Sequence, residues 1–349
     1  MRPHETVREF LLAREETLSP FAARSRDAVR DVPEPPPEVR TEFQRDRDRI
    51  IHSKAFRRLK HKTHVFVAPA GDHFVTRLTH TLEVAQVART IARALNLNED
   101  LTEAIALAHD IGHTPFGHAG EDALAELLPE GFRHNEQSVR VVELLERGGR
   151  GLNLTRQVRD GILKHSKGRG DIQAEAWGVA ETLEGQIVKL ADAVAYLNHD
   201  IQDAIRAGLL SETDLPKAAR EVLGERHSQR INTLVCDIVD ASWAATGANG
   251  TSERPIIRMS EAVAAATNEL RDFMFERVYW SEERLAEAAR ARRVVHFLFE
   301  YFSRHPEKIA SDYQRPEDSP ARRAADYISG MTDLFALRMA RELGYPDEL

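Results

Sequence analysis

The chain has 349 residues, of which 30 % are charged, and its formal net charge at pH 7 is −8. This length allows one large domain or two smaller ones, each able to bury a sizeable core. The single cysteine, Cys236, excludes an intramolecular disulfide framework and favours a reducing compartment. The acidic balance argues against attraction of the whole molecule to nucleic acid, and leaves only a local basic patch open.

Membrane and export signals are not evident. The start, MRPHETVREF, lacks the apolar run of a signal peptide, and no stretch approaches the roughly 18 to 20 apolar residues of a membrane span. We therefore expect a cytoplasmic protein without a membrane partner.

The spacing of apolar residues predicts an all-α fold. Ala, Leu, Glu and Arg dominate, whereas alternating β-branched runs bounded by Asn-Gly or Asp-Gly turns are nearly absent. Apolar residues recur at helical spacing in the segments 79–95, 100–108, 184–205 and 286–301.

Two irregular stretches suggest how the chain is divided. The stretch 32–39 holds four prolines and must be extended or linker-like. The stretch 246–255 carries Gly247, Gly250 and Pro255 and connects central helices to a C-terminal helical segment. We predict an N-terminal helical arm with its linker over 1–45, a core over 46–245, and a C-terminal segment over 246–349 that packs on the core.

The stretch 108–118, AHDIGHTPFGH, is the most informative, because three histidines and an aspartate fall within ten residues at the end of an apolar helix. Adjacent helical residues point about 100° apart, so His109 and Asp110 can share an ion only where the helix ends. Gly112, Pro115 and Gly117 supply that ending. Imidazole and carboxylate together suit Mn²⁺, Fe²⁺, Co²⁺ or Zn²⁺, and also Mg²⁺ with retained waters.

Two further residues are candidate ligands. His80 lies near the start of an amphipathic helix, and Asp192 lies in the apolar stretch VKLADAVAY, where an ionised carboxylate is costly unless it meets a cation. A lone histidine on a helix is far more often a core or surface residue than a ligand. The set as a whole weakens that interpretation. An adjacent His-Asp before a Gly/Pro break and an Asp in an otherwise apolar helix would all have to occur by coincidence.

His118 and Glu121 have the i, i+3 spacing at which a carboxylate can orient an imidazole and raise its basicity. Away from a metal motif, a surface pair contributing little would be the preferred interpretation.

The order His80, His109-Asp110, Asp192 resembles the HD phosphohydrolase superfamily, whose ligands bind metal on a helical bundle. The further motifs narrow the resemblance to deoxyguanosinetriphosphate triphosphohydrolase-like proteins. They run through most of the chain: DRDRIIHS from Asp46, FRRL from Phe56, RLTH from Arg77, HDIGH from His109, FRHN from Phe132, ADAVAYLNHD from Ala191 and DYISGMTD from Asp326. The FRRL and DYISGMTD segments are the most selective of these.

The resemblance implies an HD core that cleaves deoxynucleoside triphosphates into deoxynucleoside and triphosphate. It assigns the metal to His80, His109, Asp110 and Asp192, with Mn or Mg expected and Fe, Co, Ni or Zn also suitable. It further implies a homo-oligomer, often a hexamer, and a dNTP effector.

The same resemblance suggests roles for individual side chains. His118 and Glu121 belong to catalysis, and His134 becomes a candidate for phosphate contact or proton transfer. Arg77, three residues before His80 and on the same helical face, can reach a metal-bound phosphate. His113 either touches phosphate or supports the ligands.

The sugar contacts come from one helical face. Tyr196 and Asp200 follow Asp192 at i+4 and i+8. In the family this face meets the sugar, where an aromatic ring beneath C2′ excludes a ribose hydroxyl.

Two segments depart from the family pattern. His64 stands where Gln is expected, in KTHV instead of KTQV, so a sugar or base contact is altered and hydrolysis of several dNTPs is expected. The arm segment 25–30, SRDAVR, lacks the expected Gly-Arg pattern, which bears on an oligomer contact or an effector site.

Two rival functions stay open at this point. One is an HD hydrolase acting on an alarmone, a cyclic nucleotide or a nucleoside monophosphate. The other is a non-catalytic nucleic-acid-binding HD module that uses the basic stretch 45–62 as its contact surface. The apolar residues Ile50, Ile51, Phe56 and Leu59 make this stretch an amphipathic helix with mostly solvated charges, so nucleic acid is not expected as the substrate.

Overall fold

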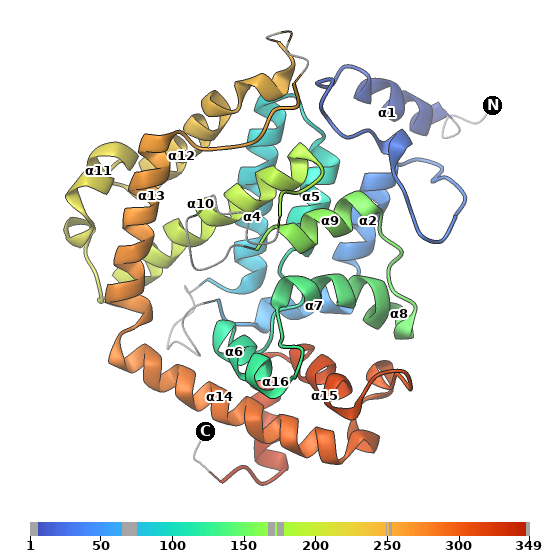
Figure 1. Cartoon of the computed structure of the whole chain (residues 1–349), viewed down its shortest axis with the longest axis vertical. Coiled ribbons are helices and arrows are strands. Elements are labelled where there is room, and N and C mark those ends of the chain that lie inside the picture. Colours follow the sequence, from blue (N-terminus) through green and yellow to red (C-terminus); the bar gives the residue numbers. More distant parts are fainter. Residues whose placement is uncertain are drawn as a thin grey trace. The chain divides into compact units, whose positions relative to one another are not determined.

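The computed structural model describes residues 6–64, 75–166, 172, 178–248, 250 and 253–346. Helices make up the regular structure of these residues (Figure 1), which contain no strand and only an isolated antiparallel bridge between Thr63 and Thr76. The predicted all-α fold is confirmed. Part of the predicted connector 246–255 lies outside the described residues, as does Val65 of the KTHV segment.

The helices form two compact units, each built from three segments of chain. The first unit comprises Met1–Ile51, Thr81–His109 and Asn153–Val278, and the second comprises His52–His80, Asp110–Leu152 and Tyr279–Leu349. One boundary follows His80 and another follows His109. The division into 1–45, 46–245 and 246–349 stays a prediction.

The first unit is organised around α5. This helix buries seven of its ten residues and packs against α2, α9 and α10, while α10 also packs against α12. The close packing of α9 depends on Gly161, where an added Cβ would lie 2.5 Å from the Ile105 side chain. The helices of this unit are α1 (Val7–Glu15), α2 (Glu42–Ile51), α5 (Glu99–Ala108), α9 (Arg156–Lys164), α10 (Leu183–Arg206), α11 (Lys217–Leu223), α12 (His227–Ala241) and α13 (Glu261–Met274). Helix α4 (Arg77–Ala94) contributes its first four residues to the second unit and the rest to the first.

The second unit is organised around the long helix α14, which packs against α6, α15 and α16 (Figure 1). Its contact face is apolar and includes Val294, Leu298 and Phe302, all buried, so burial of these side chains drives the packing. The helices of this unit are α3 (Lys54–Arg58), α6 (His118–Leu127), α7 (His134–Arg140), α8 (Glu146–Gly149), α14 (Glu282–Arg304), α15 (Pro320–Ser329) and α16 (Asp333–Glu342).

The four strongest helical patterns are confirmed. The segments 79–95, 100–108, 184–205 and 286–301 correspond to α4, α5, α10 and α14. Asn96, which follows the first of these segments, has φ +54° and so leaves the helical conformation. The proline-rich stretch 32–39 is not helical. Among the described residues, no helix is both long and apolar enough to cross a bilayer.

The predicted single amphipathic helix over 45–62 is wrong. Helix α2 ends at Ile51, and the Ser53 hydroxyl accepts a hydrogen bond from the Phe56 backbone amide and so starts the separate helix α3. Its charges are not all solvated either, because Lys62 is buried. Burial, followed by the positive charge of Arg58, lowers the pKa of Lys62 to about 7.

Candidate active site

His109 and Asp192 form the first pair of candidate ligands, and both belong to the first unit. His109 follows the last residue of α5, and its Nδ1 lies 2.7 Å from the Ala106 carbonyl oxygen. This contact favours a proton on Nδ1, which leaves the lone pair on Nε2. Nε2 lies 3.9 Å from Asp192 Oδ1.

Asp192 is a carboxylate on a helix that is otherwise largely buried. Its side chain is 17 % exposed, whereas the residues on either side, Ala191 and Ala193, are fully buried. Tyr196, one turn later, is also partly exposed. Burial, together with the negative charge of Asp192, raises the pKa of Tyr196, so its hydroxyl stays protonated. The predicted face of α10 therefore offers a carboxylate and a neutral phenol.

Asp200 lies deeper on α10 and is buried. Its Oδ1 is 2.9 Å from His199 Nδ1. Burial opposes a charge on His199, but the neighbouring Asp200 carboxylate outweighs it and raises the pKa of His199. The contact of Asp200 with His199 was not predicted.

His80 and Asp110 form the second pair, and both belong to the second unit. His80 Nε2 lies 3.9 Å from Asp110 Oδ2. The Arg77 guanidinium donates to the same oxygen at 2.6 Å, and His113 Nε2 lies 3.2 Å from Asp110 Oδ1. All four side chains are buried. Arg77 and His80 share one face of the first turn of α4, as their spacing predicts.

Both pairs have the dimensions that a divalent ion needs. Two ligand atoms on one ion cannot be more than about 4.2 Å apart when each bond is about 2.1 Å. The 3.9 Å separations in the two pairs lie within this limit. Histidine nitrogen and carboxylate oxygen form each pair, and the Ala106 carbonyl fixes the His109 ring as the partner of a metal ligand commonly does.

Glu121 joins two histidines of the second unit. Its Oε2 lies 3.0 Å from His118 Nδ1, and both of its carboxylate oxygens lie 3.0 Å from His134 Nδ1. It also accepts from the His134 backbone amide at 2.8 Å. The spacing of His118 and Glu121 predicted the first contact, whereas the contact with His134 was not predicted. The His118 side chain is 74 % exposed, while that of His134 is 11 % exposed.

The same cluster continues to Asp110 through stacked rings. His113 stacks on His134 with ring centroids 4.0 Å apart and an interplanar angle of 10°. His113 also contacts Asp110, so it joins the group around Asp110 to the group around Glu121. His113, His118, Glu121 and His134 thus form what we call the histidine cluster, whose donor atoms lie within 4.8 Å of one another.

Charge in the histidine cluster is unevenly distributed. Burial opposes ionisation of Glu121, but the charge of His134 and the hydrogen bonds from His118 and His134 lower the pKa of Glu121 well below its usual value. Burial opposes protonation of His134, but the Glu121 carboxylate raises the pKa of His134. Burial and the Arg77 charge lower the pKa of His113 well below 6.5, so this ring is neutral.

His64 lies beside His80, with ring centroids 4.4 Å apart and an interplanar angle of 39°. The expected substrate contact therefore belongs to the same unit as a candidate ligand. His165, which was not predicted, packs edge-on against His109 at 4.9 Å and is buried. No local spacing links these two residues, so the sequence offered no signal for the contact.

Comparison with known proteins shows which families the chain is similar to. Residues 77–197 match the model of the HD domain, and residues 257–342 match that of the phosphohydrolase-associated domain. A deoxyguanosinetriphosphate triphosphohydrolase-like protein of Caldanaerobacter subterraneus subsp. tengcongensis is 53 % identical over 94 % of this chain and 93 % of its own length. Another, from Desulfatibacillum aliphaticivorans, is 48 % identical over 98 % of this chain and 99 % of its own length.

A solved structure supports the fold. The crystal structure of a phosphohydrolase from Bacteroides thetaiotaomicron superposes with a TM-score of 0.51 at 16 % identity, and the match covers 92 % of this chain and 74 % of that one. The two near full-length relatives carry the assignment, and the chain belongs to the deoxyguanosinetriphosphate triphosphohydrolase-like family of HD phosphohydrolases.

Proposed function

We propose that the protein hydrolyses deoxynucleoside triphosphates to deoxynucleoside and inorganic triphosphate. The observation that carries the proposal is the unbroken series of contacts from Arg77 through Asp110 and His113 to His134 and Glu121, which ends at the exposed His118. Cleavage at the α-phosphorus needs neutralisation of phosphoryl oxygens and a group that moves a proton. This series supplies both within one unit.

We further propose that His80, His109, Asp110 and Asp192 hold one divalent ion. The proposal is supported by the two pairs of matching dimensions and by the peptide bond that joins His109 of one pair to Asp110 of the other. Mn²⁺ or Mg²⁺ is expected, and Fe²⁺, Co²⁺, Ni²⁺ or Zn²⁺ would also suit this donor set. Such an ion would polarise a phosphoryl oxygen and lower the pKa of bound water.

The other site residues are assigned separate roles in binding the phosphate and transferring the proton. Arg77 binds an α-phosphate oxygen, because its guanidinium is already fixed on Asp110 and carries a permanent charge. His113 is neutral and buried, which suits a hydrogen bond to phosphate more than charge neutralisation. His118 exchanges the proton at the reacting centre, since it is the exposed imidazole of the cluster, and Glu121 orients it.

Sugar selection is assigned to α10 and to His64. Tyr196 packs beneath C2′ and rejects a ribose hydroxyl sterically, while Asp200 accepts from the 3′ hydroxyl. His64, which replaces the glutamine typical of the family, relaxes the choice of base, so several dNTPs are substrates.

The proposal also includes the assembly of the protein. We expect a homo-oligomer, such as a hexamer, with a dNTP as effector, and we expect the protein to act in the cytoplasm.

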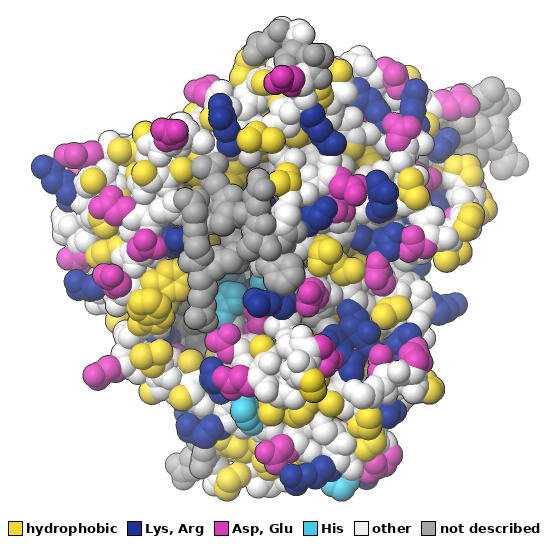
Figure 2. Space-filling model, viewed as in Figure 1, with side chains coloured by type: hydrophobic (Ala, Val, Ile, Leu, Met, Phe, Trp, Pro, Cys, Tyr) yellow, Lys and Arg dark blue, Asp and Glu magenta, His cyan; other side chains and the backbone are white. Residues whose placement is uncertain are grey.

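The rival nucleic-acid-binding function finds less support in the basic stretch 45–62. Several of its cations are already paired with carboxylates of their own unit: Arg45 with Glu34, Arg47 with Glu103, Arg49 with Glu34, and Lys54 with Asp312. On the face drawn in Figure 2, cationic and anionic side chains are interspersed. Paired cations release fewer counterions from DNA, so this surface is a weak candidate for nucleic-acid binding.

The proposal is tested by incubating the protein with each dNTP and each NTP in Mg²⁺ or Mn²⁺ and separating the products by chromatography. We expect turnover of several dNTPs and little turnover of the matching ribonucleotides. Comparable hydrolysis of GTP and dGTP would contradict the assignment of the sugar contacts. A salt-dependent DNA affinity without metal-dependent turnover would favour the rival function.

A further inference from the structure

The segment from Asp326 to Asp333, which runs from the last turn of α15 to the first residue of α16, makes polar contacts with the chain segments that carry the histidine cluster. These contacts all lie within the second unit. They come from the carboxylates of Asp326 and Asp333 and from the carbonyl and hydroxyl oxygens of Ser329. We call this segment the C-terminal clamp.

Asp333 makes the most direct of these contacts. It is 7 % exposed and is the first residue of α16. Its Oδ1 accepts from the Phe116 backbone amide at 3.0 Å, and its Oδ2 accepts from the Thr63 backbone amide at 2.8 Å and from the Thr63 hydroxyl. Phe116 comes two residues before His118, and Thr63 comes directly before His64. The Asp333 carboxylate therefore holds the backbone next to both His118 and His64.

The backbone at Phe116 needs such a restraint. Phe116 has φ +62° and Gly117 has φ +58°, so two consecutive residues adopt the left-handed region just before α6 begins at His118. For a bulky residue this conformation is strained and persists only where the surroundings impose it. The Asp333 carboxylate supplies that restraint through the Phe116 amide. A Cβ on Gly117 would lie 2.9 Å from an Arg77 guanidinium nitrogen, so the turn also passes close to Arg77.

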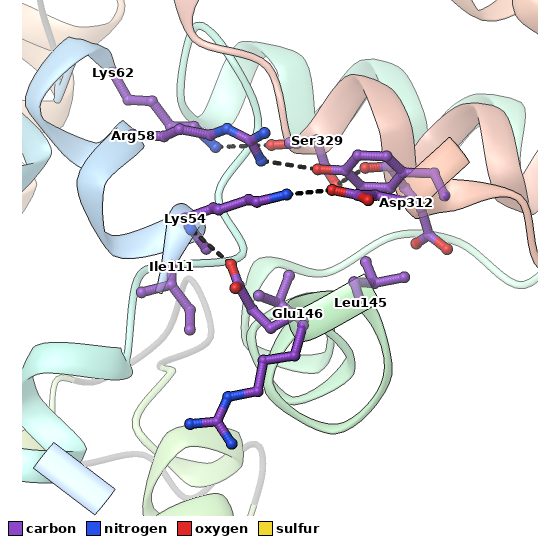
Figure 3. Close-up of a pocket in the computed structure, with 14 residues that line it drawn as sticks. Lys54, Arg58, Lys62, Ile111, Leu145, Glu146, Asp312 and Ser329 are labelled. Atoms are coloured by element: carbon purple, nitrogen blue, oxygen red, sulfur yellow. Dashed lines mark hydrogen bonds and ion pairs between the residues drawn. The ribbon is translucent and has the colours of Figure 1, made fainter. Parts of the chain in front are cut away.

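Ser329 and Asp326 hold neighbouring parts of the cluster. The Lys62 ammonium donates to the Ser329 carbonyl at 2.7 Å (Figure 3). It also donates to the His113 carbonyl. Asp326 accepts from Gln137 Nε2 at 3.0 Å and from Arg140 Nε at 2.9 Å, both on α7, the helix that begins at His134. The C-terminal clamp thus contacts each segment that supplies a histidine to the cluster.

We propose that Asp333 is a positioning residue for hydrolysis, which acts by holding the Phe116-Gly117 turn so that His118 faces the reacting phosphate. The inference rests on the proposed function for its kinetic consequence, but the tether itself can be measured without turnover. It also gives the phosphohydrolase-associated segment, residues 257–342, a part in the chemistry of the HD segment.

The test uses Asp333→Asn in the full-length protein. Asparagine keeps one acceptor oxygen, so either Phe116 or Thr63 loses its acceptor and an amide N–H faces it instead. The matched control is Ala340→Gly, which weakens the same helix α16 at a buried position without altering a contact of the C-terminal clamp. Both variants are compared for thermal stability, for amide hydrogen exchange and for kcat and KM with a dNTP.

We expect Asp333→Asn to speed amide exchange at Phe116 or Thr63 and to lower kcat about 10 to 100-fold, as a small misplacement of a reacting group does. Ala340→Gly should lower thermal stability but should change neither kcat nor amide exchange at Phe116 and Thr63 beyond that loss of stability. In a His118→Ala background, Asp333→Asn should cost little further activity, because residues that act through one group are not additive. Equal exchange and equal kcat in Asp333→Asn and Ala340→Gly would overturn the inference, and so would an undiminished effect of Asp333→Asn in the His118→Ala background.

Failure of the proposed function would be recognisable separately. Selective loss of amide protection at Phe116 in Asp333→Asn supports the tether even if the wild-type chain hydrolyses no dNTP.

Discussion

Glu121 accepts from two imidazoles with opposite surroundings, one exposed and one buried. This asymmetry separates their roles. His118 can reach a substrate, whereas His134 is enclosed and keeps Glu121 ionised through its charge. A carboxylate held in this state is a good hydrogen-bond acceptor for the His118 ring and can orient it.

The first prediction concerns His118. Replacing it by alanine should lower kcat by about 10² to 10⁴-fold, the usual contribution of a positioned acid or base. Metal content should be unchanged, because His118 is not among the proposed ligands. Metal analysis and steady-state kinetics on the same sample check this. Activity within a small factor of wild type would place His118 among ordinary surface residues.

A second prediction follows from the raised pKa of His134 and the lowered pKa of Glu121. A raised histidine pKa contributes stability below its unfolded value of about 6.5 and loses it as pH rises through the folded pKa. The lowered glutamate pKa contributes stability above about 4.3 and loses it as pH falls through the folded pKa. His134→Gln should therefore lower the free energy of unfolding most between these two unfolded values, at about pH 5 to 6.

Denaturant unfolding of wild type and His134→Gln at a series of pH values measures this difference. It should shrink as pH rises above the folded pKa of His134. A difference that stays constant or grows at alkaline pH would contradict the charge assignment.

Local spacing predicted the contacts that lie within one helix turn and missed those between distant segments. The contact of His118 with Glu121 followed from their separation of three residues. The contacts of Glu121 with His134 and of His109 with His165 join separate helices, and a periodic pattern carries no information about them. The ion pair of His199 with Asp200 was missed although the residues are adjacent, because adjacency on a helix usually separates side chains.

At the scale of the elements, long apolar patterns predicted helices well and short ones did not. Helices α4, α5, α10 and α14 were predicted because burial of one face repeats over several turns. The stretch 45–62 carries the same pattern but breaks at Ser53, whose hydroxyl begins a new helix. The π-helical segments at Val141–Leu145 and Phe275–Tyr279 also had no signal in the apolar spacing.

The third prediction concerns how closely α7 approaches the loop after His109. A Cβ on Gly112 would collide with the Ser138 backbone nitrogen and lie 2.6 Å from the His134 carbonyl oxygen. Backbone atoms cannot move aside as a side chain end can. Gly112→Ala should therefore cost about 1 to 3 kcal/mol or more and displace His134, so both thermal stability and turnover should fall.

Gly131→Ala is the matched control for Gly112→Ala. Gly131 has φ +75° but nothing within 4 Å of an added Cβ, so only backbone strain is introduced. It should destabilise less than Gly112→Ala and leave the contacts of His134 in place. Equal losses of stability and turnover in the two variants would show that the close approach of α7 is unimportant.

At the scale of the whole molecule, metal binding and turnover should depend on the same four proposed ligands, His80, His109, Asp110 and Asp192. Asp110→Ala and Asp192→Ala should each remove bound metal and turnover together, since each takes away half of a pair. Binding to the folded state alone stabilises it by about 2.7 kcal/mol when free metal is 100 times its dissociation constant. Chelation should accordingly lower the melting temperature of wild type but not of these variants. Full metal retention by both variants at native affinity would remove the assignment.

The most direct test of the account is the identity of the products formed in ¹⁸O-labelled water. The side chains of Arg77 and His113, which both contact Asp110, are proposed to bind the α-phosphate. Water is proposed to attack the α-phosphorus and displace the 5′ oxygen of the nucleoside. Mass spectrometry after one turnover of a dNTP should therefore find unlabelled deoxynucleoside and inorganic triphosphate that carries one ¹⁸O. Release of pyrophosphate with deoxynucleoside monophosphate, or label in the nucleoside, would contradict the account.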